Sequence, residues 1–305
     1  MNLTVLMPVY NGGEKTKFAI KSILKQTYKD FEFLIVNDGS TDITEEVILS
    51  FKDSRINYKK IEHLGISNAL NYGINNSSGD YIARMDGDDI SLLSRLELQV
   101  QEIKKDSSIS ILSNWYAHMK NYKVFRVVQT PLSNEQIKRD LLKQSVICHA
   151  SSILKKSDII KIGLYNPEYE GLEDYELWLR GLNEFTFKNI PQVLYCVNDY
   201  GKKEINKNNK QILFDLTNKY LSLYGSAETK FDSTYLYGNK EQLRGLKLPK
   251  LNLKYLFRYF YSFMPKFIYN KKIDLWLYWR MLILKTMFSK QKSEINKEIK
   301  EIISN

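Results

Sequence analysis

Short β-rich runs alternate with segments of helical periodicity through the first ~100 residues of the chain. Candidate strands lie at 3–7, 31–36, 56–61 and 81–84, and candidate helices at 14–26, 47–51 and 66–74. Strands that alternate with helices at this spacing predict a parallel sheet built with right-handed crossovers. The fold class we expect is therefore α/β.

Two common nucleotide-binding loops are absent from this pattern. The first candidate strand is followed by Val9–Gly13, which contains no Gly-x-Gly-x-x-Gly sequence, and the chain has no Gly-Lys-Ser/Thr loop. A dinucleotide-binding Rossmann domain and a P-loop NTPase are therefore disfavoured.

The fourth candidate strand ends in an acidic turn, in which Asp86, Asp88 and Asp89 lie within four residues. Crowded carboxylates raise one another's pKa unless a cation lies among them. Oxygen ligands suit Mg²⁺ or Mn²⁺, and the carboxyl ends of strands are where open α/β sheets bind ligands. The alternative is an acidic turn that caps the next helix, and Asp89 could serve equally in either role.

A second acidic pair, Glu173 and Asp174, follows a glycine-containing loop and begins a helix. The helix has an apolar face that includes Tyr175 and Trp178. The pair could serve chemistry, or it could only complement the positive end of the helix dipole.

The middle of the chain gives weaker signals. We expect helices at 92–105 and 133–144, a strand at 109–112, a β-rich stretch at 123–129 and a strand at 145–154. Cys148 and Cys196 each lie inside an apolar run, which predicts buried free thiols and a reducing compartment. We expect no cleavable leader and no membrane span, since no apolar run reaches about 18 residues.

The net charge of +10 is concentrated near the C-terminus. Residues 1–199 balance at −2, residues 200–245 at +3 and residues 246–305 at +9. Twelve aromatic residues lie in 251–288 among lysines and arginines, a pattern typical of helices at a membrane surface. Ordinary packing on the rest of the chain and nucleic-acid binding are the alternatives. A last amphipathic helix, with isoleucines at 295, 299, 302 and 303, would pack internally or in a homodimer.

Five motifs together resemble the inverting family 2 glycosyltransferases of the GT-A fold, and in particular the bacterial enzymes of O-antigen, capsule and exopolysaccharide synthesis. They occur in the family's order, at 8–11, 37–42, 65–74, 79–89 and 173–180. The resemblance implies a mostly parallel GT-A sheet. It implies a catalytic domain at 1–200, with a nucleotide-binding half at 1–100 and an acceptor half at 101–200, followed by a helical aromatic and basic module at 201–305. One position departs from the pattern, since Leu70 stands where many relatives have an arginine.

The same resemblance implies the residues of a donor site. Asp38 would accept a hydrogen bond from the uracil N3–H of a UDP-sugar, and Asp88 would bind Mn²⁺ or Mg²⁺ directly. Arg84 would approach the diphosphate or else pair with neighbouring acids. The donor-binding residues implied are Pro8, Val9, Tyr10, Asn11, Asp38, Arg84, Asp86 and Gly87.

The resemblance also implies the residues that act on the acceptor. Asp174 would be the general base and Glu173 would orient the acceptor. His149 and Trp178 would contact the acceptor or the diphosphate, although each sits in an apolar segment where core packing is the alternative. A donor with an α-linked sugar would give a β-linked product.

The function that we expect is transfer of a hexose or N-acetylhexosamine from a UDP-sugar to a free or polyprenyl-diphosphate-linked glycan. The C-terminal module would hold the enzyme at the cytoplasmic face of the membrane, without nucleic acid as a partner. A phosphatase of the haloacid dehalogenase type would carry its Asp-x-Asp on the first strand, and a sugar nucleotidyltransferase would carry an arginine in the loop at 9–13. A membrane-surface scaffold with a non-catalytic domain is the non-enzymatic alternative.

Overall fold

The computed structural model describes residues 1–198, 207–224 and 275–304. The alternation predicted for the first ~100 residues is confirmed. The strands are β1 (Leu3–Val9), β2 (Glu32–Asp38), β3 (Ile56–Ile61), β4 (Tyr81–Arg84), β5 (Ile90–Ser91), β6 (Ile111–Lys120), β7 (Lys123–Val128), β8 (Ile153–Lys155) and β9 (Phe187–Asn198). The helices are α1 (Glu14–Leu24), α2 (Thr44–Leu49), α3 (Ile66–Asn76), α4 (Arg95–Lys105), α5 (Asn134–Leu141), α6 (Lys156–Lys161), α7 (Glu173–Arg180), α8 (Lys207–Tyr224) and α11 (Leu275–Ser304).

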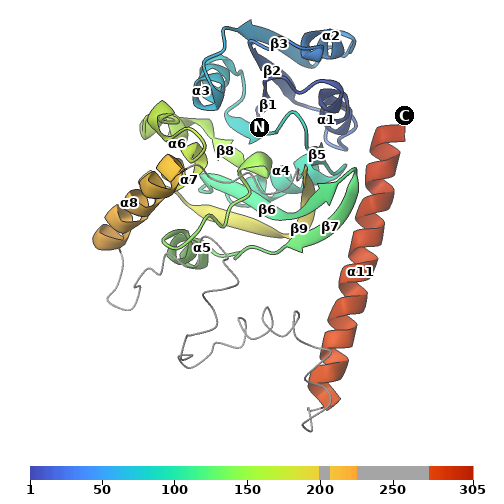
Figure 1. The fold of residues 1–305 in the computed structure, drawn as a ribbon, viewed down its shortest axis with the longest axis vertical. Coiled ribbons are helices and arrows are strands. Elements are labelled where there is room, and N and C mark those ends of the chain that lie inside the picture. The colour runs from blue at the N-terminus through green and yellow to red at the C-terminus, as the bar shows by residue number, and fades with distance from the viewer. Residues whose placement is uncertain (199–206, 225–274, 305) are drawn as a thin grey trace. The chain divides into compact units, whose positions relative to one another are not determined.

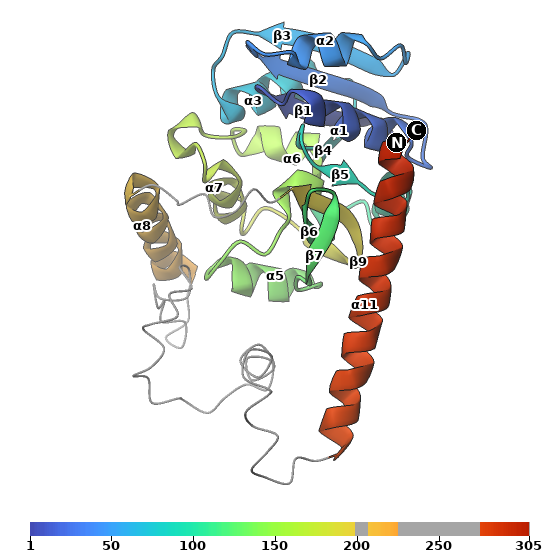
Figure 2. The same cartoon turned by 45° about the vertical axis from the view of Figure 1, so that its right-hand side comes forward.

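The strands form one mixed sheet in the order β3-β2-β1-β4-β8-β6-β9-β5, with β7 paired to β6. The first four neighbours, β3, β2, β1 and β4, are all parallel. Beyond β4 the sheet is mixed: β8 is antiparallel to both β4 and β6, whereas β6 and β9 are parallel. In Figure 2, β1–β3 lie at the top of the view, and β6, β7 and β9 lie below them. The expected fold, a mostly parallel GT-A-like sheet, is confirmed.

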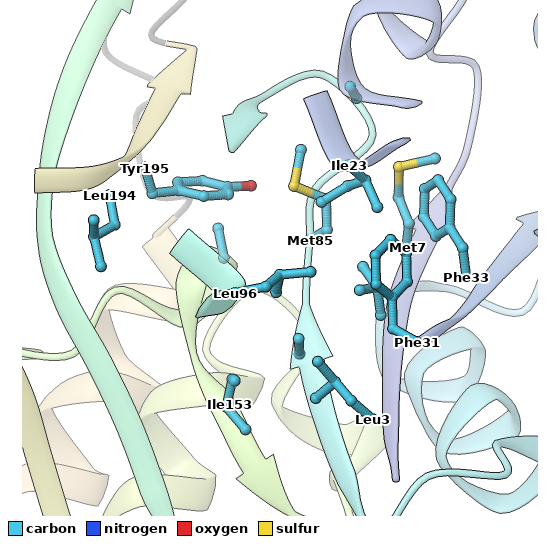
Figure 3. Packing of buried hydrophobic residues seen from close by; sticks show 14 of the residues in the cluster. Leu3, Met7, Ile23, Phe31, Phe33, Met85, Leu96, Ile153, Leu194 and Tyr195 are labelled. Carbon is cyan, nitrogen blue, oxygen red and sulfur yellow. The ribbon is translucent and has the colours of Figure 1, made fainter. Parts of the chain in front are cut away.

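The parallel half is covered by helices on both faces (Figure 1). Side chains of α1, α2 and α4 share one hydrophobic cluster with alternate residues of β1 and β2, such as Met7 and Ile35. On the other face α3 lies so close to β1 that a Cβ at Gly73 would be 2.2 Å from a methyl carbon of Leu6. Figure 3 shows the cluster around Met7, Phe33, Met85 and Tyr195. Burial on both faces explains why β1 and the middle of β2 are almost uniformly apolar, whereas the edge strand β3, which is partly exposed, carries two lysines.

The expected strand at 145–154 is the main error in the secondary-structure prediction. Only Ile153–Lys155 is a strand, and His149–Ser151 forms a 3₁₀ turn. The hydroxyl of Ser151 donates to the carbonyl of Cys148, and the hydroxyl of Ser152 donates to the carbonyl of His149. Such local bonds compete with strand pairing, and they favour the turn here. Both cysteines are free and buried, as expected.

The described residues 1–198, helix α8 and the last turns of α11 belong to one compact unit. The boundary at residue 200 between a catalytic domain and a C-terminal module stays a prediction. Ile295, Ile299 and Ile302 are buried in a cluster with residues of β5, β6 and β9, which confirms the internal alternative for this helix. Most of the aromatic and basic stretch at 251–288 lies outside the described residues. Within the part that is described, no helix is long and apolar enough to cross a membrane.

Candidate functional site

The predicted donor residues gather at one edge of the sheet because β1, β2 and β4 are parallel and end there. The loops after β1 and β2 are tied together. The amide N–H of Asn11 donates to Ser40 Oγ at 3.0 Å, and Asn11 Oδ1 accepts from the amide of Thr41 at 2.9 Å. Asn11 adopts a φ of 49°, which asparagine tolerates better than most residues. Two hydrogen bonds therefore join the loop after β1 to the loop after β2.

Asp38 is the last residue of β2 and is buried. Its carboxylate accepts hydrogen bonds from the backbone amides of Leu64 at 2.9 Å and Gly65 at 3.1 Å. The Nδ1 atom of His63 is 2.9 Å from Asp38 Oδ2. Two backbone amides and the His63 imidazole thus converge on this carboxylate. The sequence analysis missed His63, which lies only two residues before the motif at 65–74.

Arg84 and Asp86 form an ion pair at the end of β4, with Arg84 Nη1 2.6 Å from Asp86 Oδ1. Burial is the largest single influence and lowers the pKa of Arg84, but the charge and hydrogen bond of Asp86, together with Tyr195 and Tyr165, raise it above its usual value. Of the two roles left open for Arg84, the structure displays pairing with an acid. A diphosphate bound at this edge would meet the same positive charge.

Asp89 does not cap the helix that follows, which corrects one alternative from the sequence. It is 2% exposed, and its Oδ1 accepts from the backbone amide of Asn198 at 2.7 Å. Burial first, and then the charges of Asp86 and Asp88, raise the pKa of Asp89 well above its usual value. A cation at this turn would oppose that shift.

Asp86 and Asp88 are the half-buried carboxylates of the acidic turn. Among residues 1–198, 207–224 and 275–304, no three His, Cys, Asp or Glu side chains are grouped so that they could hold a metal ion by themselves. Mg²⁺ commonly uses one or two carboxylates together with substrate phosphates. The acidic turn fits a divalent cation of that kind, whose remaining ligands come from a bound diphosphate and water.

The second acidic pair begins α7. Glu173 Oε2 accepts from the amide of Gly171 at 2.6 Å, and Asp174 Oδ1 accepts from the amide of Tyr175 at 2.7 Å. Burial, followed by the charge of Asp174, raises the pKa of Glu173 to about 7. Burial also raises the pKa of Asp174, while the positive charge of Arg84 lowers it. Both carboxyl groups are thus shifted in the direction that makes a carboxylate a stronger base.

Arg84 links the two acidic groups. Its guanidinium contacts Asp86, and its charge acts on the pKa values of Glu173 and Asp174. The charge of Asp86 in turn raises the pKa of Asp174. The structure therefore brings together acids that lie about 90 positions apart in the sequence.

His149 and Trp178 are both buried. His149 Nε2 is 2.8 Å from the hydroxyl of Tyr165, and burial and Arg84 lower the pKa of His149 well below its usual value. Trp178 is fully buried, with its ring 5.8 Å from that of His149. Trp178 thus packs in the core, as its helical spacing suggests, and its contact with acceptor or diphosphate stays a prediction. Tyr165 gave no signal in the sequence.

A buried arginine forms a hydrogen bond with the backbone just before the acidic turn. Arg95 is fully buried, and its Nη2 donates to the carbonyl of Arg84 at 2.7 Å. The hydroxyl of Tyr195 accepts from the amide of Asp86 at 3.1 Å, and Figure 3 shows it directed toward Met85. Arg95 lies four residues before Gln99 and eight before Ile103 on the buried face of α4, and that spacing is the signal that the sequence analysis overlooked.

A mixed α/β sheet with acidic residues gathered at the carboxyl ends of its parallel strands is the arrangement of the GT-A fold. The model of glycosyl transferase family 2 matches residues 4–163, and the chain belongs to this family.

The chain is 35% identical over 187 residues to an uncharacterized glycosyltransferase of Rickettsia typhi, a match that covers 59% of this chain and 58% of that protein. It is 32% identical to the Escherichia coli protein named UDP-Glc:alpha-D-GlcNAc-diphosphoundecaprenol beta-1,3-glucosyltransferase WfgD, covering 64% of this chain and 75% of WfgD. Among solved structures, S. aureus TarS 1-349 in complex with UDP-GlcNAc shares the fold, with a TM-score of 0.58, 15% identity and coverage of 80% of this chain and 78% of TarS 1-349.

Proposed function

We propose that this protein is a metal-dependent, inverting glycosyltransferase. It transfers a hexose or N-acetylhexosamine from a UDP-sugar to a hydroxyl of a glycan, in the synthesis of a bacterial surface polysaccharide. The observation that carries the proposal is the convergence of Asp86 and the pair Glu173 and Asp174 around Arg84, at the carboxyl edge of the parallel strands.

The donor would bind along this edge. Its uracil would lie against Pro8, Val9 and Tyr10, with N3–H directed at Asp38, and its diphosphate would lie near Arg84 and the acidic turn. A divalent cation bound by Asp88 would supply charge neutralisation for the leaving UDP.

Asp174 would act on the acceptor. The acceptor hydroxyl attacks C1 of the sugar from the face opposite the diphosphate, and the bond between C1 and the diphosphate oxygen breaks. Asp174 takes the proton of the hydroxyl, and the electron pair of the broken bond leaves with UDP. Its raised pKa suits a general base, because proton affinity near the working pH favours proton transfer. Glu173 would orient the acceptor.

The comparisons support the choice of substrates. The name of WfgD gives a UDP-glucose donor and a diphosphoundecaprenol-linked acceptor, and one TarS structure contains UDP-GlcNAc. We propose a lipid-linked acceptor for this chain as well, and with it a location at the cytoplasmic surface of the membrane. The basic and aromatic stretch at 251–288 would provide the contact with anionic lipid.

A panel of UDP-, GDP- and dTDP-sugars with Mn²⁺ or Mg²⁺ tests the proposal through release of nucleoside diphosphate, with and without a lipid-linked glycan acceptor. We expect metal-dependent release from one UDP-sugar, and chelation by EDTA should abolish it. Asp88→Ala should remove the metal dependence of UDP binding, whereas Asp80→Ala, an exposed acid that precedes β4, should not change it. Equal UDP affinity of Asp88→Ala and wild type, with and without Mn²⁺, would show that Asp88 is not a metal ligand.

A further inference from the structure

His63 covers the carboxylate of Asp38 although the proposed reaction gives it no role. It lies between β3 and α3, and its backbone is held against the loop after β2. Gly39 there has a φ of 71°, and a Cβ at Gly39 would lie 2.7 Å from the amide nitrogen of His63. Only glycine fits this approach, so the point from which the imidazole extends is fixed.

The imidazole lies flat on the ring of Tyr10. The ring centroids are 3.9 Å apart and the planes are inclined by 14°. The His63 side chain is 51% exposed and Tyr10 is 47% exposed, so both rings border solvent. One face of the imidazole is covered by Tyr10, and about half of the side chain is open to solvent.

The hydrogen-bond partners of His63 fix its tautomer. Nδ1 is 2.9 Å from Asp38 Oδ2 and 3.1 Å from the backbone oxygen of Asp38. Both oxygens only accept hydrogen bonds, so Nδ1 carries the hydrogen and donates it. A planar ring stacked on Tyr10 thus directs an N–H at the Asp38 carboxylate.

A uracil bound as in the proposed function would present the same two features, a flat ring against Tyr10 and an N3–H that donates to Asp38. We propose that the His63 imidazole occupies the place of the nucleobase in the donor-free protein and competes with it. Binding of the UDP moiety then requires the imidazole to rotate out, while the amides of Leu64 and Gly65 keep their bonds to Asp38. The inference rests on the proposed function, because it concerns the same base position.

This competition has a measurable size. If the imidazole covers Asp38 in about 90% of the molecules, the apparent affinity for UDP is about tenfold below the intrinsic affinity. Removal of the ring should restore that factor. The alternative is that His63 stays in place and stacks on the bound base. Removal of the ring would then weaken UDP binding, because stacking area would be lost.

The test is calorimetric titration of the full chain with UDP in the presence of Mn²⁺. We expect His63→Ala to bind UDP about tenfold more tightly than wild type, and Glu62→Gln, an exposed neighbour in the same loop, to bind as wild type does. Equal or weaker binding by His63→Ala would overturn the inference.

Histidine ¹⁵N spectra provide a second measurement, because the chain has only three histidines. Addition of UDP should shift the His63 signals from the bonded Nδ1–H tautomer to those of a solvent-exposed ring. If UDP binds and the His63 signals do not move, the inference is wrong. If no nucleoside diphosphate binds to wild type or to His63→Ala, the proposed function itself fails.

Discussion

At the scale of single residues, the site depends on the environment of two carboxyl groups that are adjacent in the chain. Glu173 is 8% exposed and bonded to the Gly171 amide, while Asp174 is half-buried at the first turn of α7. Burial raises both pKa values and Arg84 opposes the rise. Asp174 is the side chain that remains partly open, and it is therefore the one that we propose as the base for an acceptor hydroxyl.

Asp174→Asn tests this assignment. Asparagine keeps the size of the side chain and an oxygen for the Tyr175 amide, but it cannot take a proton at neutral pH. We expect kcat to fall by roughly 10²–10⁴-fold, with the affinity for the UDP-sugar retained. Turnover is measured by UDP release and affinity by calorimetry. Asp80→Asn is the control, and wild-type turnover by Asp174→Asn would remove Asp174 as the base.

The raised pKa of Glu173 predicts a pH dependence of stability. Because its folded-state pKa is about 7 against an ordinary value of 4.5, the folded protein binds this proton more tightly than the unfolded chain. The resulting stabilisation is present below pH ~4.5 and is lost as the pH rises through 7.

Glu173→Gln does not titrate, so its free energy of unfolding relative to wild type should rise by up to about 3 kcal/mol between pH 4.5 and 8. Urea unfolding at several pH values measures this difference, with the exposed Glu168→Gln as control. A difference between Glu173→Gln and wild type that stays constant with pH would show that Glu173 is not shifted upward.

At the scale of elements, α4 positions the acidic turn and is itself anchored by α1. Ser94 provides no side-chain cap for α4. Instead Gln26, just beyond α1, accepts from the Leu96 amide at 3.0 Å and donates to the carbonyl of Leu92 at 2.8 Å. A buried glutamine from another helix thus takes the place of a local cap.

Gln26→Leu should therefore destabilise the protein although leucine is of similar volume. The Leu96 amide would lose its partner in a buried position, at a cost of about 1–3 kcal/mol in the free energy of unfolding. Thermal or urea denaturation measures the loss. Gln101→Leu, on the exposed face of α4, is the matched control, and equal stability of the two variants would contradict the remote cap.

At the scale of the whole molecule, the C-terminal segment completes the core of the catalytic unit. Ile299 is fully buried among residues of β5, β6 and β9, and the side chain of Asn296 accepts from the Val124 amide at 2.8 Å. The segment covers β5, a strand of two residues at the end of the sheet order. The last residues of the chain therefore contribute to the support of the site formed by the first 200.

Ile299→Ala should lower the free energy of unfolding by about 2–5 kcal/mol, since a buried isoleucine is replaced by a much smaller side chain. Lys300→Ala, on the exposed side of the same turn, should change it by less than about 0.5 kcal/mol. Equal unfolding midpoints for the two variants would show that the segment does not stabilise the catalytic unit.

The sequence by itself determined what depends on short-range pattern. The strand at 56–61, the carboxylates after the fourth strand and the buried isoleucines at 295, 299 and 302 follow from periodicity and turn residues, which are local properties. The order of five motifs determined the family.

The tertiary structure decided what depends on partners far apart in the chain. The bond from Arg95 to the backbone of Arg84, the contact of His149 with Tyr165 and the stack of His63 on Tyr10 have no counterpart in local pattern. The sequence shows that a side chain is polar, but not whether folding brings a donor or an acceptor to meet it. Burial makes these partners more important to the free energy of folding, because a buried polar group shifts its pKa or requires a partner that only the fold can supply.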